Sequence, residues 1–304
     1  MSTAVAEWID LLDPDEGALR QAWAGRLHPQ AVDDLVEPTV HGDEPRPKLE
    51  SHGGYVLGVL LVPVVITAED RVYYREVDLV LTPEVVLTVR KTPPGGTPLD
   101  LATVEGVYRS GVPAGMIAYH IVEQVAEGFL DLVDDLNDEI DELEDHVEDW
   151  PNNQVRLRLS DLRHDLLQIR RTMAPTRDAL RRVVDDRIEV DSGDLFPHDV
   201  ELHFGDAYDK LLRATEGLDA ARDLIAGVRD YHQSKVANDQ NEVMKRLTVV
   251  ASLLLVPTFI VGLYGQNFSH IPELHWAQGY GFSWVLIVLT TIGQLWYYRR
   301  KEWI

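Results

Sequence analysis

Cysteine is absent from the 304 residues of this sequence. The chain can therefore form neither a disulfide framework nor a thiolate metal site, and a metal ion would have to be bound by oxygen or histidine ligands. The glycine pairs Gly53-Gly54 and Gly95-Gly96 lack the spacing of a phosphate-binding loop. Since no nucleophile, general base or pocket motif stands out either, the sequence gives no support to an enzyme.

Basic residues are scarce, with 28 Lys and Arg against 51 Asp and Glu and a formal net charge of −23. This balance argues against nucleic acid or anionic lipid as the main partner and suits cations. The first residues, MSTAVAEWIDLLDPDE, have neither a basic flank nor an apolar run. We therefore expect no cleaved signal peptide, and membrane insertion would depend on segments further along the chain.

Charged residues are missing from two long stretches near the C-terminus, Leu247 to Phe268 and Leu274 to Tyr298. At ~1.5 Å rise per residue, each is long enough as a helix to cross a hydrocarbon core of ~30 Å. The second stretch is most apolar from Phe282 onward, and we place the second membrane helix and its basic tail within residues 281–304. Two membrane spans are thus predicted at the C-terminal end.

Basic residues flank both stretches on the sides away from the connecting loop: Lys245, Arg246, Arg299, Arg300 and Lys301. The loop itself, residues 269–280, has no Lys or Arg and a single acid, Glu273. Short loops that carry Lys and Arg stay in the cytoplasm. Both termini are therefore expected to be cytoplasmic and the loop extracytoplasmic.

Residues 1–105 have the composition of an α/β domain. The sequence predicts helices and strands at Ala18–Leu27, Pro29–Val36, Tyr55–Ile66, Val72–Leu81 and Val85–Val89. Residues 92–96, TPPGG, predict a turn after the last strand. For the segment Arg46–Glu50, a solvated turn ahead of the Tyr55 strand is one of two adequate interpretations.

Residues 106–197 predict a helical hairpin. The first helix, 117–150, has one apolar seam, and 11 acids without any Lys or Arg lie between Asp131 and Asp149. The second helix, 155–187, contains nine Arg. An antiparallel hairpin would set basic against acidic residues, although each exposed ion pair contributes only ~0–1 kcal/mol. We interpret these charges as structural first, with attraction of cations as a secondary consequence.

Residues 198–268 predict one long helix, because no proline occurs from His198 to Val256. At ~1.5 Å per residue, a helix of that length would extend roughly 100 Å. Pro257 removes one hydrogen bond within the span and is expected to bend it. Neighbouring helices or sister subunits would have to support so long a helix.

One face of the first span carries small, hydroxyl and apolar residues at helical spacing: Asn241, Met244, Leu247, Ala251, Leu255, Thr258 and Gly262. Small residues on one stripe are typical of ordinary helix packing in membranes, and periodicity alone favours that interpretation. The stripe ends, however, in Gly265-Gln266-Asn267. Carbonyl and amide oxygens are the ligands that a hard, hydrated cation needs, which favours an ion pathway.

Four segments in order resemble motifs of the CorA family of divalent-cation channels. The family signature is Gly-Met-Asn after a tyrosine at the end of the first of two terminal spans, and Tyr264–Phe268 matches it with Gln266 in place of Met. The other matching segments are Asn241–Lys245, Ile271–Leu274 and Glu302–Ile304. Ser269 departs from the pattern, because many relatives carry a second acid there. Arg46–Glu50 also resembles a family segment.

The resemblance implies an α+β N-terminal cytoplasmic domain, a long helical stalk and two C-terminal transmembrane helices, assembled as a pentameric funnel. It implies a homopentamer in the cell (inner) membrane that admits Mg²⁺, and also Co²⁺ or Ni²⁺, driven by the membrane potential and gated by cytoplasmic Mg²⁺. Partners would be divalent cations and membrane lipid, with no nucleic acid and no organic cofactor.

The family also suggests roles for single residues. Gly265, Gln266 and Asn267 would form the selectivity filter, with Glu273 attracting cations in the loop. The stripe below the filter would supply polar rings at Thr258 and Asn241 and constrictions at Leu255, Leu247 and Met244.

Asp206 aligns with a regulatory carboxylate of the family, although an exposed helix Asp is an equally ordinary interpretation. Its partner acid is uncertain, because Gly53-Gly54 stand where relatives can place one. Two alternatives stay open for the function. One is a zinc transporter of the same superfamily, since Gln266 replaces Met; the other, more remote, is a membrane-anchored coiled-coil sensor or scaffold.

Overall fold

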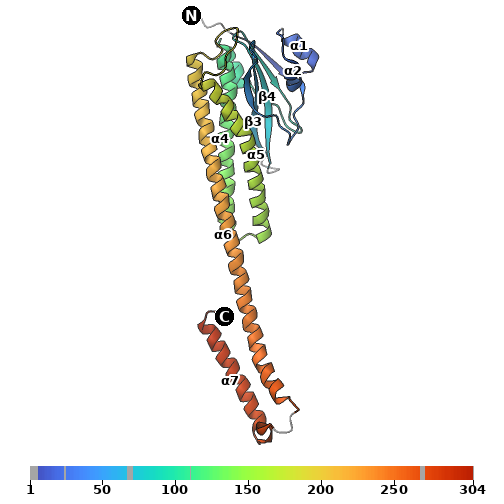
Figure 1. Cartoon of the computed structure of the whole chain (residues 1–304), viewed down its shortest axis with the longest axis vertical. Coiled ribbons are helices and arrows are strands. Elements are labelled where there is room, and N and C mark those ends of the chain that lie inside the picture. Colours follow the sequence, from blue (N-terminus) through green and yellow to red (C-terminus); the bar gives the residue numbers. More distant parts are fainter. Residues whose placement is uncertain (1–5, 24, 67–70, 110, 268–270, 304) are drawn as a thin grey trace. The chain divides into compact units, whose positions relative to one another are not determined.

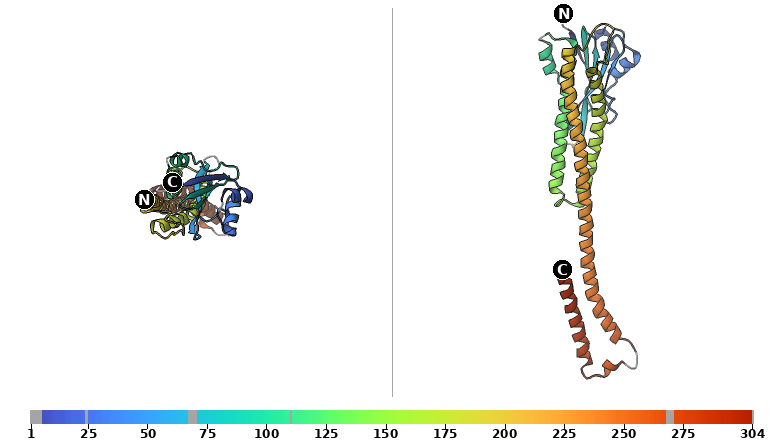
Figure 2. Two further views of the ribbon diagram at one scale, coloured as in Figure 1. Left: turned by 90° about the horizontal axis from the view of Figure 1, so that it is seen from above. Right: turned by 60° about the vertical axis from the view of Figure 1, so that its left-hand side comes forward.

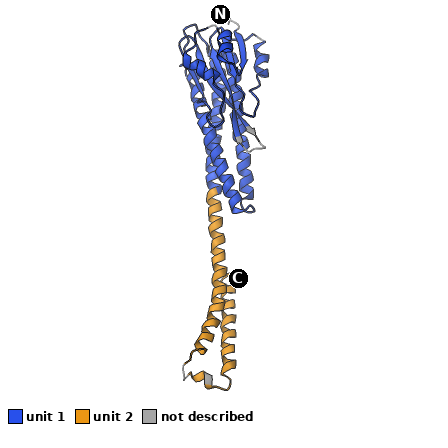
Figure 3. Ribbon diagram, turned by 90° about the vertical axis from the view of Figure 1, so that its right-hand side faces the viewer, with its two compact units in different colours: residues 1–228 blue, residues 229–304 orange. Residues whose placement is uncertain are grey.

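The computed structural model describes residues 6–23, 25–66, 71–109, 111–267 and 271–303. They form two compact units, Met1–Val228 and Arg229–Ile304, here named unit 1 and unit 2 (Figure 3). The boundary lies within one long helix, α6, which runs from His198 to Tyr264.

Unit 1 contains a five-stranded sheet in the order β1-β5-β4-β3-β2. Its strands are β1 (Glu7–Leu12), β2 (Lys48–Ser51), β3 (Val56–Ile66), β4 (Arg71–Leu81) and β5 (Val85–Arg90). The β1 strand is parallel to β5, and the other neighbours are antiparallel. The sheet is therefore mixed, with a long β3–β4 hairpin at its centre.

Both faces of the sheet are buried, because side chains along a strand alternate between the two sides. In β4, Leu79 and Leu81 belong to the larger hydrophobic cluster, whereas Val80 between them belongs to the smaller one. In β3, Val56 and Leu57 divide in the same way. A sheet whose two faces are both apolar needs a helical layer on each side.

Helices supply these two layers (Figures 1 and 2). They are α1 (Glu16–Ala22), α2 (Pro29–Val36), α3 (Ala102–Tyr108), α4 (Ala114–His146) and α5 (Asn152–Val184). The smaller cluster joins one face of the sheet to α1 and α2 through Leu19 and Leu35. The larger cluster joins the other face to α4, α5 and the first part of α6, which lie side by side, through residues such as Phe129, Ile169 and Phe204.

The predicted α+β N-terminal domain, long helix and two C-terminal candidate membrane helices are confirmed, with differences in detail. The two hairpin helices begin and end within four residues of the predicted bounds. They share a core with the sheet, so the segments predicted as 1–105 and 106–197 pack as parts of one unit. The interpretation of Arg46–Glu50 as a solvated turn was wrong, because Lys48–Ser51 pairs with β3 as an edge strand. Helix α1 ends at Ala22 rather than Leu27, since Trp23 already has an extended backbone.

Unit 2 contains the second part of α6, a short 3-10 helix, η1 (Pro272–His275), and α7 (Gly279–Arg300). By length and composition, α6 and α7 are the two helices in the described part of the chain that could cross a membrane. Helix α6 continues through Pro257 and ends at Tyr264. The predicted end of the span at Phe268 and the start of the loop at Ser269 lie outside the described residues.

Candidate functional site

The C-terminal end of α6 presents the motif Gly265-Gln266-Asn267 in exposed positions. The Gly265 N–H donates to the Val261 carbonyl at 2.9 Å, and the Gln266 N–H donates to the Leu263 carbonyl at 3.4 Å. The helix thus ends directly at the motif, where the helix dipole is negative. Two side-chain amides and a negative dipole together favour a cation at this end.

The stripe predicted from periodicity lies on the uncovered side of α6. Met244, Leu247 and Leu255 are 58%, 60% and 69% exposed, whereas Val249 and Ile260 are only 4% and 7% exposed. At about 100° per residue, the second pair lies roughly opposite the first set on the helix. Since Val249 and Ile260 are covered and the stripe is not, the described part of unit 2 leaves the stripe open.

The polar members of the stripe are also exposed. The Thr258 hydroxyl donates to the Leu254 carbonyl at 2.7 Å, so its oxygen keeps lone pairs that point away from the helix axis. Asn241 is exposed one turn before Met244 and Lys245. Along the stripe, the polar side chains of Asn241 and Thr258 therefore lie on either side of the large apolar residues Met244, Leu247 and Leu255.

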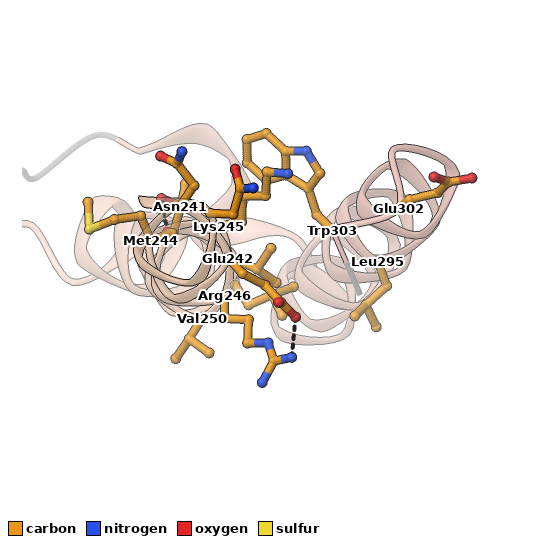
Figure 4. A pocket seen from close by; sticks show the side chains of 13 residues that line it. Asn241, Glu242, Met244, Lys245, Arg246, Val250, Leu295, Glu302 and Trp303 are labelled. Atoms are coloured by element: carbon orange, nitrogen blue, oxygen red, sulfur yellow. Dashed lines mark hydrogen bonds and ion pairs between the residues drawn. The ribbon is translucent and has the colours of Figure 1, made fainter. Parts of the chain in front are cut away.

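A cavity of about 1240 Å³ lies at the Asn241 end of unit 2 (Figure 4). Asn241, Met244 and Lys245 line it from α6, and Leu295 and Trp303 line it from α7 and the tail that follows. Figure 4 shows Trp303 reaching from the end of α7 toward α6. The cavity is polar at the end that precedes the uncharged stretch and apolar along the stretch itself.

The predicted residues are not all brought together. Glu273 lies half-buried in η1, and residues 268–270, which connect it to Asn267, are outside the described part of the chain. Asp206 lies in unit 1, far along α6 from the motif. Within the described residues, no group of three or more His, Cys, Asp or Glu could hold a metal ion.

Asp206 is exposed on α6, next to a network of hydrogen bonds between α6 and α4. The Tyr119 hydroxyl donates to Glu123 Oε1 at 2.8 Å, and Lys210 Nζ lies 3.4 Å from the same oxygen. Burial raises the pKa of Tyr119, and the negative charges of Glu123 and Asp206 raise it further. The region around Asp206 therefore already carries negative potential before any second subunit is considered.

Gly53 has a positive φ of 77°, which favours glycine. A Cβ at this position would lie 3.1 Å from Asp191 Oδ2. The Asp191 N–H donates to the Gly53 carbonyl at 2.8 Å, which holds the Asp191 side chain there. The acid beside Gly53-Gly54 in this chain is thus Asp191, which the sequence did not single out.

Sequence reasoning also missed a polar contact between the two helices of unit 2, made by Ser252, Gln294 and Tyr298. Single polar residues inside an apolar stretch give no periodic signal. The spacing of four between Gln294 and Tyr298, which places both on one face of α7, could have pointed to them.

The family description "CorA-like Mg2+ transporter protein" matches residues 4–300, nearly the whole chain. The chain belongs to the CorA-like Mg²⁺ transporter family. The cobalt/magnesium transport protein CorA of Thermotoga maritima is 28% identical over 282 residues, which cover 91% of this chain and 77% of that protein. The zinc transport protein ZntB of Yersinia pseudotuberculosis is 28% identical over 183 residues, which cover 60% of this chain and 51% of that protein.

The fold agrees with a solved CorA structure. The complete structure of the CorA magnesium transporter from Methanocaldococcus jannaschii matches with a TM-score of 0.77 at 21% identity, covering 98% of this chain and 91% of that one. As a CorA-family member, the chain is a divalent-cation transporter with two candidate membrane spans, and not an enzyme.

Proposed function

We propose that this CorA-family chain assembles as a homopentamer around α6 and conducts Mg²⁺ into the cell. The observation that carries the proposal is the contrast between the two sides of α6. One side is covered through Val249 and Ile260, whereas the stripe with Leu247 and Leu255 is exposed and leads to the Gly265-Gln266-Asn267 end. Five such stripes facing one axis would line a pore.

In this arrangement the filter acts on a hydrated ion. Mg²⁺ loses its water reluctantly, so a ring of Asn267 side chains with Gly265 carbonyls would contact it through its water shell. Thr258 and Asn241 would add polar rings further along. Met244, Leu247 and Leu255 would form apolar constrictions that close by expelling water.

The driving force needs no nucleotide. One elementary charge gains ~2.3 kcal/mol per 100 mV of membrane potential, so a divalent ion gains ~4.6 kcal/mol on entering a negative interior. The direction fits both termini on the cytoplasmic side of the inner membrane, as the basic flanks predict. Glu273 would then raise the local concentration of cations outside.

Regulation by Mg²⁺ follows from charge. Five chains at −23 each give a formal charge of −115, so the subunits repel one another unless cations lie between them. We propose that cytoplasmic Mg²⁺ closes the channel by bridging subunits through carboxylates that include Asp206. Loss of Mg²⁺ would loosen the ring, and the long α6 would carry the movement to the constrictions.

Zinc is the second candidate ion. Gln266 replaces the Met of the usual signature, and a zinc transport protein is among the relatives. Both observations concern selectivity rather than the pathway. The proposal of Mg²⁺ is supported by the family description and by the Thermotoga maritima relative, which matches over more of the chain.

The test is metal-resolved flux in proteoliposomes with an imposed membrane potential. Asn267→Ala should abolish divalent flux without changing the oligomer size, because the exposed Asn267 lies outside the packed core. Gln278→Ala, which removes another exposed amide before α7, serves as the matched control and should conduct like wild type.

Comparing Mg²⁺, Zn²⁺, Co²⁺ and Ni²⁺ in the same vesicles separates the candidate ions. If the wild-type protein conducts Zn²⁺ preferentially and Asn267→Ala abolishes that flux, the pore assignment stands and the transported ion is Zn²⁺ rather than Mg²⁺. Wild-type flux in Asn267→Ala would overturn the filter assignment. If the wild-type protein conducts none of the four ions, the proposed channel function is wrong. The membrane-anchored scaffold would then be the remaining interpretation.

A further inference from the structure

Three side chains connect α6 to α7 inside the uncharged stretches. The Tyr298 hydroxyl donates to Ser252 Oγ at 2.8 Å, and Gln294 Nε2 donates to the Ser252 carbonyl at 3.2 Å. The Ser252 hydroxyl in turn donates to the Val249 carbonyl at 2.9 Å. Tyr298 and Gln294 thus contact the same residue of α6 from adjacent turns of α7.

The contact lies between the covered side of α6 and the proposed pore stripe, because Ser252 is three residues from both Val249 and Leu255. Ser252 is half-buried and three residues after Val249, which is 4% exposed. Leu255 and Leu247 lie on the exposed side. The polar contact therefore does not compete with the pore stripe for the same surface.

The tail after α7 folds back onto this contact. Glu302 has a φ of 57°, in the left-handed region that non-glycine residues rarely adopt, and this turn reverses the chain. The Trp303 N–H donates to the Tyr298 carbonyl at 3.1 Å, and the two rings stack with centroids 5.7 Å apart. The Trp303 side chain then lines the cavity with Asn241 and Met244 (Figure 4).

We propose that Ser252, Gln294, Tyr298 and Trp303 form a latch that holds α7 and the C-terminal tail on α6, so that the two helices move together when the channel opens. This inference rests on the proposed function. Tyr298 is its central positioning residue, since its hydroxyl binds α6 while its ring supports Trp303. The latch fixes α7 next to the part of α6 that carries the Met244 and Leu247 constrictions.

The latch is expected to be stable because its hydrogen bonds lie within the uncharged stretches. Hydrocarbon offers no water to replace a lost hydrogen bond, and polar contacts between membrane helices contribute measurably to their association. Without the latch, the rotation of α7 about α6 would lose the polar contacts that Ser252 makes with Gln294 and Tyr298. When α6 moves, α7 would then follow it less closely.

The test uses Tyr298→Phe in the full-length protein, with Tyr297→Phe as the matched control. Tyr297 is its exposed neighbour, and in the described part of the chain its hydroxyl has no hydrogen-bond partner. Tyr298→Phe should lower the initial Mg²⁺ flux about threefold to fivefold at unchanged oligomer size. Tyr297→Phe should leave the flux unchanged.

A double-mutant cycle separates the latch from a general structural effect. If the Tyr298 hydroxyl acts through Ser252, the variant Tyr298→Phe with Ser252→Ala should unfold thermally at the same temperature as the worse single variant. Tyr297→Phe with Ser252→Ala should show additive shifts. If the shifts in unfolding temperature of Tyr298→Phe and Ser252→Ala add in the double variant, the latch proposal is wrong.

The absence of cysteine allows a rescue experiment. Ser252→Cys with Tyr298→Cys, joined by a short bismethanethiosulfonate cross-linker, replaces the hydrogen bond by a covalent one. Flux should fall in the unlinked variant, return on cross-linking and fall again with reductant. Loss of flux on cross-linking would show that the helices must separate, which contradicts the latch. If the wild-type protein carried no Mg²⁺ at all, the proposed function would fail, and the unfolding cycle would still decide the latch.

Discussion

Phe129 in α4 is fully buried, whereas Phe259 in α6 is 68% exposed. The first lies in unit 1, where the sheet and the helices bury one another's apolar faces. The second lies in unit 2, where α7 has no buried residue and large apolar side chains cover the surface. Unit 1 therefore obtains its core from contacts within one chain, while unit 2 requires lipid or further copies to cover its surface.

The strongest test of this difference is the same substitution in both units. Phe129→Ala should lower the midpoint of thermal unfolding by roughly 10 °C, since a buried Phe→Ala change costs about 3–5 kcal/mol. Phe259→Ala should lower it by less than about 2 °C, because its side chain makes few contacts within the chain. Calorimetry on detergent-purified protein measures both. Similar shifts would show that unit 2 is packed as tightly as unit 1.

Buried charge sharpens the comparison, because unit 1 encloses ionisable groups as well as apolar ones. Lys91 Nζ lies 2.6 Å from Glu76 Oε1 and 3.0 Å from Asp78 Oδ2, and it donates to the Asp34 carbonyl at 2.7 Å. Burial, together with repulsion from Glu76, raises the pKa of Asp78 to about 8 despite the opposing effect of Lys91. Burial thus favours the protonated form of Asp78 in the folded chain.

The second prediction follows from this pKa. The unfolded chain releases the Asp78 proton near pH 4, but the folded chain keeps it until about pH 8. The contribution of Asp78 to the free energy of unfolding therefore falls as pH rises from about 4 to 8 and is constant above that. Asp78→Asn should remove this dependence, so its unfolding midpoint should rise relative to wild type by about 2–4 °C per pH unit across that range.

Thermal scans of full-length protein between pH 5 and 9 measure the Asp78→Asn effect. Asp223→Asn, on the exposed side of α6, is the matched control and should follow the wild-type profile. Parallel profiles for Asp78→Asn and wild type would contradict a protonated Asp78.

A smaller change in the unfolding midpoint is expected when an ion pair between the acidic helix α4 and the Arg-rich helix α5 is removed. Arg158 in α5 lies 3.3 Å from Glu139 in α4, and burial, with repulsion from Asp165, raises the pKa of Glu139 to about 7. Arg158→Glu should lower the unfolding midpoint by about 3 °C at pH 8, where Glu139 is ionised, and by less at pH 5.5, where it is protonated. Arg156→Glu, on an exposed position, should change it by less than about 1 °C. Equal effects in saturating Mg²⁺ would mean that the α4 acids are simply solvated.

Periodic and compositional features could be predicted from the sequence. The seam of α4 and the two uncharged stretches repeat a signal over many residues, and the structure contains the corresponding helices. Helix α2 has the predicted bounds, Pro29–Val36, because Pro29 begins it and His28 accepts a hydrogen bond from the Gln30 N–H. Long segments with a regular pattern, and helices with clear capping residues, can thus be predicted from the sequence.

Features that depend on distant partners could not be predicted. Strand β1 pairs with β5, about 80 residues away, as Trp8 Nε1 donates to Thr88 Oγ1. The N-cap residue of the short helix α3 is Leu101, whose side chain cannot accept a hydrogen bond. At the candidate site, the stripe was readable from its spacing. Its exposure, and the contact of Ser252 with Tyr298, depend on how α7 lies against α6.

The smallest expected effect concerns an exposed surface of unit 1 that a second subunit would cover in the proposed assembly. Leu202 is 61% exposed, and Asp206 is exposed one turn later on the same face of α6. If Mg²⁺ bridges subunits through Asp206, then Asp206→Ala should shift the Mg²⁺ dependence of protease protection to about twofold higher concentration. The effect is small because an exposed carboxylate contributes little to binding. Asp209→Ala, on a neighbouring exposed position, should leave the curve in place. An unchanged curve in Asp206→Ala would exclude this residue as the sensor and leave the proposal for Gly265 to Asn267 untouched, because the filter depends on unit 2 alone.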